Sequence, residues 1–314
     1  MGLVMNAEVY GLDNNFKQLA VRYDESHEVL WTYFNQKNIV PCANYEIVNE
    51  IIQHQEEIAK NRGVLFTQDK TFNIKYSVAA SLTPNVFHLG GQLTLIRDLA
   101  RNQHKEALLA YATKAIDLLY NRLSRFNGCS IINISLIQGL ALGAGLEGAL
   151  TSDVIIAERK SLFSFPEMLF NMFPGMGGYS LVARKAGIKV ADEMILGAKQ
   201  YTAEQAYEMG IVDVLVDDGE GEKAVYNWIE KNKRFSNGYL AAQKAKNRLN
   251  PITYDELMDI TRMWVDVALK LTDREFSIMD RFISMQEKQY LPANVANQAN
   301  GTNGNVFSIS RSAT

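Results

Sequence analysis

The chain has 314 residues, 47% of them hydrophobic, which is enough for one large domain or two smaller ones with a sizeable core. Its 32 basic and 35 acidic residues nearly balance, so the composition does not point to a nucleic-acid partner. Cys42 and Cys129 lie far apart, which favours a reduced, cytoplasmic protein. The four histidines lack metal-ligand spacing, so we expect no metal and no other cofactor.

Membrane insertion is also not expected. The most apolar window, residues 131–150, contains Asn133, Gln138 and Glu147. The first residues lack the basic region and long apolar core of a secretory signal.

The first half of the chain predicts alternating strands and helices. Apolar alternation predicts strands at 19–24, 29–34, 73–80 and 130–137, the first two joined as a hairpin. Helical periodicity predicts helices at 44–60, 92–100 and 105–126. Recurring strand–strand–helix units favour an α/β fold built as a ββα spiral.

The stretch that follows the strand at 130–137 carries the candidate chemistry. Glycines 139, 143 and 145 predict a tight turn into a short helix, 147–150, whose start exposes unsatisfied N–H groups. Glu147 and Glu167 lie among apolar neighbours, and the strand predicted at 153–157 would bring both to one end of a sheet. Buried carboxylates have raised pKa values suited to proton transfer. Both glutamates are equally compatible with ordinary exposed helix positions, where Glu is mostly found.

The character of the chain changes after the apolar run 212–216. Residues 217–222 form a charged, glycine-bearing loop, and successive helices are predicted up to about residue 290. We therefore divide the chain into a core with the active site at 1–218, a helical region at 219–290, and a mobile Asn/Ser/Gly-rich tail at 291–314.

Five motifs in order resemble the crotonase (enoyl-CoA hydratase/isomerase) superfamily. They are QGLALGAGLE at 138–147, SD at 152–153, FPE at 165–167, FPGMGG at 173–178 and ILGAKQYTAEQAYEMGIVD at 195–213. The resemblance implies the crotonase (ClpP/crotonase-like) spiral, with a C-terminal helical region that assembles a homotrimer or hexamer. It implies catalytic roles for Glu147 and Glu167, and an oxyanion hole made by the N–H groups of Gly91 and Ala144.

A narrower resemblance runs over about residues 19–290. The segments at 21–34 and 88–93 and the run from Phe163 to Ser180 look like the diffusible-signal-factor synthase (RpfF-type) branch. Gln92 replaces the family's Asp, and 38–45 reads NIVPCANY in place of an Arg-Pro signature, which puts CoA as the carrier in doubt.

The narrower resemblance implies a bifunctional dehydratase and acyl thioesterase. It would dehydrate a medium-chain 3-hydroxyacyl-[acyl-carrier protein] to the cis-2-enoyl thioester and release the free acid as a quorum-sensing signal. A regulatory sensor protein is a further implied partner.

An apolar acyl pocket is expected around the two glutamates. We assign substrate-binding roles to Leu89, Leu142, Gly143, Phe173, Met176, Gly177 and Trp264. Trp264 is equally consistent with a plain core residue. Two alternatives stay open: an ordinary enoyl-CoA hydratase of fatty-acid degradation, with an acyl-CoA thioester substrate, and a non-catalytic crotonase-like scaffold.

Overall fold

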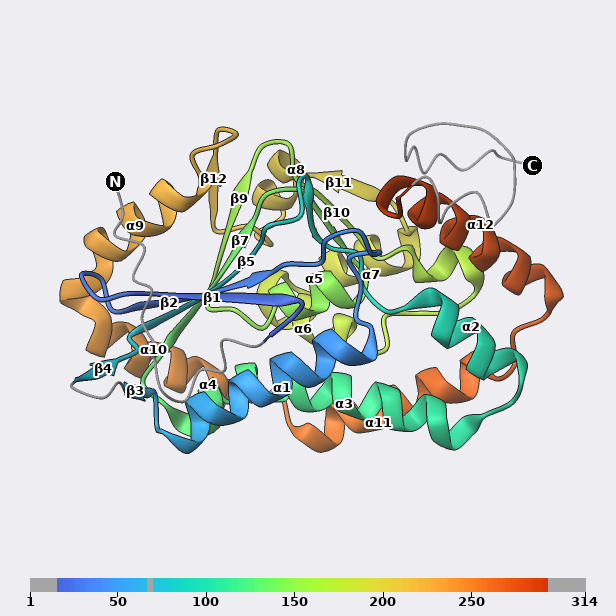
Figure 1. Ribbon diagram of the computed structural model, residues 1–314, viewed down its shortest axis with the longest axis horizontal. Helices are drawn as coiled ribbons and strands as arrows, with labels where there is room; N and C mark the ends of the chain where they lie inside the picture. Colours follow the sequence, from blue (N-terminus) through green and yellow to red (C-terminus); the bar gives the residue numbers. More distant parts are fainter. Residues whose placement is uncertain (1–15, 67–69, 293–314) are drawn as a thin grey trace.

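A computed structural model of the chain describes residues 16–66 and 70–292, and its largest element is a six-stranded sheet (Figure 1). The strand order is β1-β2-β5-β7-β9-β12, with β1 antiparallel to β2 and every other neighbouring pair parallel. The strands are β1 (Leu19–Asp24), β2 (Val29–Phe34), β5 (Tyr76–Ser81), β7 (Ile132–Ile137), β9 (Val154–Glu158) and β12 (Val214–Val216). The predicted α/β class is confirmed.

A smaller sheet of three-residue strands lies beside the larger one. Its order is β11 (Gln200–Thr202), β10 (Leu162–Ser164), β8 (Leu140–Leu142) and β6 (Val86–His88). A separate hairpin pairs β3 (Val64–Phe66) with β4 (Thr71–Asn73). Strand β8 falls within the stretch that the sequence predicted as a glycine turn, and β10 lies in a segment for which no element was predicted.

Helices cover both faces of the larger sheet because every central strand has apolar side chains on both faces. On one face, Trp31, Val78 and Ile134 pack against α9 (Gly221–Asn232) and α10 (Ser236–Leu249). The other face packs against α3 (Lys105–Leu123), α6 (Gly178–Ala186) and α7 (Ile188–Gly197).

The remaining helices surround this framework (Figure 1). They are α1 (Tyr45–Lys60), α2 (Leu93–Arg101), α4 (Arg125–Gly128), α5 (Ala144–Ala149), α8 (Ala203–Glu208), α11 (Tyr254–Ala268) and α12 (Asp273–Tyr290), with short 3₁₀ turns η1 (Pro166–Phe170) and η2 (Lys233–Phe235). The helix predicted at 44–60 is confirmed as α1, and the Asn44 side chain caps it by accepting a bond from the Ile47 N–H. No helix in 16–66 or 70–292 is long and apolar enough to cross a membrane.

Three predicted boundaries were wrong. The strand expected at 73–80 is interrupted, because the Ile74 N–H bonds to Gly63 O (2.8 Å) beside the β3–β4 hairpin. The helix expected at 105–126 ends at Leu123, because Arg125 and Phe126 adopt left-handed backbone angles. The short helix expected at 147–150 begins at Ala144, where Gly143 O accepts the first helical bonds. The predicted tail lies largely outside the described residues.

Candidate functional site

Glu147 is positioned by a strand–glycine–helix turn. Strand β8 ends at Leu142, Gly143 turns the chain with φ of +49°, and α5 begins at the next residue. A side chain at Gly139 would meet the backbone of Asn85 at 2.0 Å, so glycine is required where the loop before β6 passes β8. Glu147 lies in the first turn of α5 and is 1% exposed.

Glu167 is positioned by the neighbouring strand. Strand β10 runs parallel to β8, with Leu162 opposite Leu140 and Ser164 opposite Leu142. It leads through Phe165 into the 3₁₀ turn that carries Glu167. Because the carboxyl ends of parallel strands meet at one sheet edge, the two glutamates come together there. The sheet that joins them was not predicted, but their meeting at one sheet edge was.

The two carboxylates are held differently. Glu147 Oε1 accepts hydrogen bonds from the backbone N–H groups of Met176 (2.8 Å) and Gly178 (2.7 Å). Glu167 Oε1 packs against Gly143, where an added Cβ would lie 2.3 Å from it. Glu167 Oε2 is buried and has no hydrogen-bond partner among the described residues. Glu147 is therefore fixed by the main chain, and Glu167 has an oxygen available for a ligand.

Burial shifts both carboxylates toward the protonated form. It raises the pKa of Glu147 to about 7, against the opposing effect of the Gly178 and Met176 hydrogen bonds. Burial and the nearby charge of Glu147 raise the pKa of Glu167 to about 8. At neutral pH the pair therefore tends to share protons, with the ionised form favoured at Glu147, which suits one base and one acid in the same site.

Two backbone donors predicted as an oxyanion hole lie in adjacent loops. A side chain at Gly90 would meet Leu142 O at 2.8 Å and Ala144 N at 3.1 Å, so the Gly90–Gly91 loop lies directly on the turn before α5. Ala144 is the first residue of that helix. Within the described residues, neither the Gly91 nor the Ala144 N–H donates a hydrogen bond. Both are available to bind a developing negative charge.

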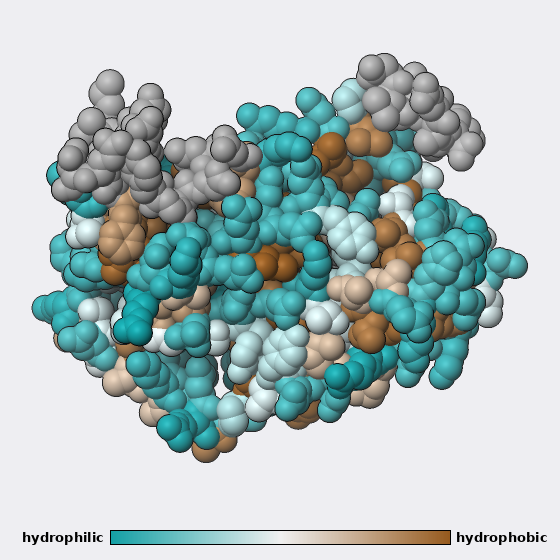
Figure 2. Space-filling model, turned by 60° about the horizontal axis from the view of Figure 1, so that its bottom comes forward, coloured by the Kyte–Doolittle hydropathy of each residue, from teal (hydrophilic) through white to brown (hydrophobic). Residues whose placement is uncertain are grey.

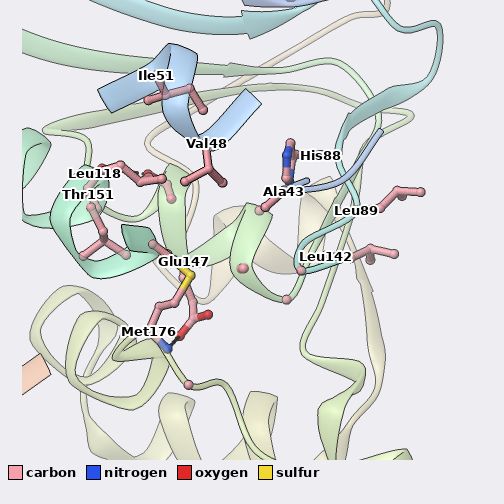
Figure 3. A pocket seen from close by; sticks show the side chains of 18 of the residues that line it. Ala43, Val48, Ile51, His88, Leu89, Leu118, Leu142, Glu147, Thr151 and Met176 are labelled. Atoms are coloured by element: carbon pink, nitrogen blue, oxygen red, sulfur yellow. Dashed lines mark hydrogen bonds between the residues drawn. The ribbon is translucent and has the colours of Figure 1, made fainter. Parts of the chain in front are cut away.

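A mostly apolar cavity of about 180 Å³ connects these groups. Gly91, Ala144, Glu147 and Glu167 all line it. Figure 3 shows Glu147 and Met176 together at one side, with Val48, Ile51 and Leu118 projecting from two helices. An apolar cavity with a few polar groups at one place is typical of a small-molecule site.

The predicted substrate-binding residues divide into two groups. Those that line the cavity are Leu89, Leu142, Gly143, Met176 and Trp264. Phe173 and Gly177 are not among its lining residues. Phe173 packs against the cluster around Phe170 and Phe276, and Gly177 begins α6 with Leu257 where a side chain would stand. Both residues lie outside the lining of this cavity, and their substrate-binding role stays a prediction.

Sequence reasoning missed the wall contributed by α1 and α3. Val48, Ile51, Ala115, Leu118 and Leu119 line the cavity from these helices. An apolar helix face looks the same whether it meets a core or a ligand, so the periodicity contained no signal for this role. Within the described residues, no group of three or more His, Cys, Asp or Glu side chains is arranged to hold a metal.

Comparison with known proteins relates this geometry to a family. The model for enoyl-CoA hydratase/isomerase matches residues 52–275. "Probable enoyl-CoA hydratase 2, mitochondrial" of Arabidopsis thaliana is 31% identical over 171 residues, which is 54% of this chain and 53% of that protein. The 2,3-dehydroadipyl-CoA hydratase of Escherichia coli K12 is 36% identical over 132 residues, 42% of this chain and 49% of that protein. The match thus spans about half the length of these curated relatives.

Solved structures show the same fold. Pseudomonas aeruginosa DspI has a TM-score of 0.59 at 21% identity, covering 87% of this chain and 97% of that one. Human mitochondrial delta3-delta2-enoyl-CoA isomerase has a TM-score of 0.71 at 16% identity, and the match covers 87% of this chain and 99% of that one. The predicted crotonase fold is confirmed by these likenesses. Because the family model matches well over half of the sequence, this chain belongs to the enoyl-CoA hydratase/isomerase family.

Proposed function

We propose that this protein is a diffusible-signal-factor synthase that dehydrates a medium-chain 3-hydroxyacyl thioester and then hydrolyses the product. The observation that carries the proposal is the pair of buried carboxylates at one side of an apolar cavity, beside two unbonded backbone donors. The sequence resemblance over residues 19–290 supports the signal-synthase branch, and membership of the hydratase family supports chemistry at an acyl thioester.

The dehydration divides between the two glutamates. Ionised Glu147 removes the proton from the α-carbon, and protonated Glu167 gives its proton to the β-hydroxyl, which leaves as water while the carbon–carbon double bond forms. The thioester oxygen gains negative charge as the α-proton leaves, and the Gly91 and Ala144 N–H groups stabilise it. Removing one such donor typically raises the barrier by about 3 kcal/mol.

Hydrolysis uses the same groups on a different atom. A carboxylate takes a proton from water, the water oxygen attacks the carbonyl carbon, and the two N–H groups hold the tetrahedral oxyanion. The carbon–sulfur bond then breaks and the thiol of the carrier leaves with a proton. The products are the free cis-2-enoic acid and the carrier, which we propose to be acyl-carrier protein.

The test is mass spectrometry of extracts from cells that express the wild type, Glu147→Gln or Glu167→Gln. We expect free cis-2-enoic acid from the wild type and a loss of at least about a hundredfold in each variant, the usual scale for removing a general acid or base. Free 3-hydroxy acid persisting in one variant would assign the thioesterase role to the other glutamate. Wild-type extracts without enoic acid would contradict the proposal.

An ordinary enoyl-CoA hydratase is the second candidate, because the curated relatives carry that name. The purified protein should then hydrate a short 2-enoyl-CoA efficiently and show no preference for carrier-protein thioesters. A non-catalytic scaffold is disfavoured, because two buried carboxylates reduce stability without benefit unless they serve a reaction.

A further inference from the structure

The cavity extends well beyond the two glutamates along helix α1. The segment just before α1 lies against the Gly90–Gly91 loop, because the Ala43 N–H donates a hydrogen bond to Gly90 O (2.8 Å). Val48, Ile51, Gln55 and Ile58 follow along one side of the helix, at three- and four-residue spacing, and all line the cavity. A rise of 1.5 Å per residue puts position 54, nine residues after Tyr45, about 14 Å along the axis from the helix start. An acyl chain with its thioester at Gly91 would therefore point its tail toward this end.

At that end the lining includes polar side chains beside the apolar Ile58 and Phe126. The inner face of the six-stranded sheet contributes the hydroxyls of Thr32, Ser77 and Ser135 from three adjacent strands. Helix α1 adds His54 and Gln55. Two of the hydroxyls already have partners, since Ser135 Oγ lies 2.7 Å from Ser152 Oγ and Thr32 Oγ1 lies 2.9 Å from His54 Nε2.

Two of these side chains have polar atoms without a partner. His54 is 3% exposed, and its Nε2 lies 2.9 Å from Thr32 Oγ1, but its Nδ1 has no hydrogen-bond partner in the described residues. Gln55 is 5% exposed, and its Oε1 is likewise unpaired there. Buried polar atoms normally have partners, because leaving them unpaired costs stability. A hydroxyl of an occupant can donate to Gln55 Oε1, whereas a carboxylate only accepts and would have to bind donors at this end of the cavity.

A guanidinium gives the same end a positive charge. Arg122, on α3, lines the cavity and donates through Nη2 to Ile134 O (2.8 Å) and Ser152 Oγ (3.1 Å). Within the described residues it forms no salt bridge, and its Nε has no partner. Asp153, whose negative charge acts on Arg122, is paired with Arg125. Burial and the charge of Arg122 lower the pKa of His54 to about 4, so its imidazole is neutral.

We propose that the acyl substrate carries an oxygen-bearing group, a hydroxyl or a carboxylate, at the end of its chain remote from the thioester. His54, Gln55 and Arg122 would bind this group, with the sheet hydroxyls around it. The inference deepens the proposed function and rests on an acyl chain occupying the cavity. A site built from polar groups rejects the analogue that lacks the matching group, because its own atoms then stay unpaired.

Binding of free medium-chain acids to the purified full chain tests this without catalysis. Isothermal titration calorimetry would compare three acids of equal length that end in a methyl, a hydroxyl or a carboxylate. We expect at least one oxygenated acid to bind roughly tenfold more tightly than the methyl-terminated acid, the scale of one or two net hydrogen bonds. The hydroxyl and carboxylate arms separate hydrogen bonding from charge. Equal or tighter binding of the methyl-terminated acid would overturn the inference.

Variants then test whether His54 and Gln55 cause the preference for oxygenated acids. His54→Phe and Gln55→Leu should reduce the ratio between oxygenated and methyl-terminated acids to near one, while Glu56→Gln, at an exposed position of the same helix, should retain it. A retained ratio in both folded cavity variants would reject the assigned residues. If both variants fail to fold, titration of the three acids into the wild type still tests whether an oxygenated chain end is preferred.

The two proposals fail separately. An oxygenated-acid preference without enoic acid production would reject the synthase and keep this site. Production of enoic acid without a preference for oxygenated acids would support the synthase and reject the polar binding site.

Discussion

The buried environment of Glu147 makes the free energy of unfolding depend on pH. The side chain is 1% exposed, and burial raises its pKa from 4.5 to about 7. The folded protein therefore binds this proton more tightly than the unfolded chain does. The free energy of unfolding must then fall as pH rises from about 4.5 to about 7, and stay lowered above that.

The substitution Glu147→Gln should remove the fall in unfolding free energy that ionisation of Glu147 causes at high pH. At pH 8 the variant should gain up to about 3 kcal/mol of unfolding free energy relative to the wild type, and the gain should vanish near pH 4. Urea denaturation at several pH values measures it. A gain that is independent of pH would contradict the raised pKa.

Glu158 provides the matched control, since it is also fully buried. Burial opposes its ionisation, but bonds from Gln138 (2.7 Å) and Gly221 (3.2 Å) and an ion pair with Lys160 (3.1 Å) lower its pKa overall. Glu158→Gln should therefore destabilise the protein at neutral pH, and the loss should shrink as pH falls through the lowered pKa.

The proposed dehydration predicts a pH dependence of activity that is set by Glu147 and Glu167. Dehydration needs one ionised and one protonated carboxylate, and the paired pKa values are about 7 and about 8. We expect kcat/KM to be bell-shaped with its maximum between them, falling in acid as the base protonates and in alkali as the acid ionises. Stopped assays across pH 5 to 10 measure this profile. A flat profile would show that the pair does not set the rate.

Helix α5 shows how one short element constrains the site. A side chain at Gly145 would lie 2.4 Å from His88 O, whereas one at Gly148, in the same helix, would meet nothing within 4 Å. Glycine in a helix costs about 1 kcal/mol relative to alanine. The two positions therefore differ only in what surrounds them.

Gly145→Ala should separate the turn that carries Ala144 from the Gly90–Gly91 loop. We expect a loss of 1–3 kcal/mol in unfolding free energy, as for other overpacked sites. Gly148→Ala should be neutral or gain up to about 1 kcal/mol. Thermal denaturation of both variants checks this, and equal effects would show that the close approach at His88 is unimportant.

The elements that sequence patterns predicted are those with long periodic signals. Helices α1 and α3 and strands β1, β2 and β7 each have enough apolar repeats to define a face. Strands β8 and β10 have three residues each, and their pairing connects segments 22 residues apart, so no local pattern indicates them. The paired glutamates were found because their motifs are specific. The polar groups at His54 and Arg122 were not, because their meeting depends on how α1 and α3 pack over the sheet.

At the scale of the whole molecule, several apolar side chains remain exposed on the C-terminal helices and the turn between them. Leu249 is 87% exposed, Phe235 56% and Met263 55%. The face drawn in Figure 2 is largely polar, with apolar residues in small areas. Exposed apolar residues are candidates for interaction surfaces, and we propose that the homotrimer or hexamer predicted from the resemblance uses this region.

Light scattering should give a mass of three or six times the 35.3 kDa chain. The double variant Phe235→Glu with Leu249→Glu should lower that mass, because charges in an apolar interface oppose association. A wild-type mass equal to one chain would contradict the trimer. A wild-type trimer that the double variant leaves intact would place the interface elsewhere.

The main-chain hydrogen bonds to Glu147 have a consequence for how this protein can change over evolutionary time. Both donors are backbone N–H groups, from Met176 and Gly178, so the position of the carboxylate does not depend on which side chain stands at 176. Yet the Met176 side chain lines the cavity. Mutation at this position can therefore reshape the space for a substrate while the proton-transferring group keeps its place. Under the proposed function, chain preference could therefore change without a change in reaction chemistry, because a substitution at 176 alters the cavity and leaves both donors to Glu147 in place.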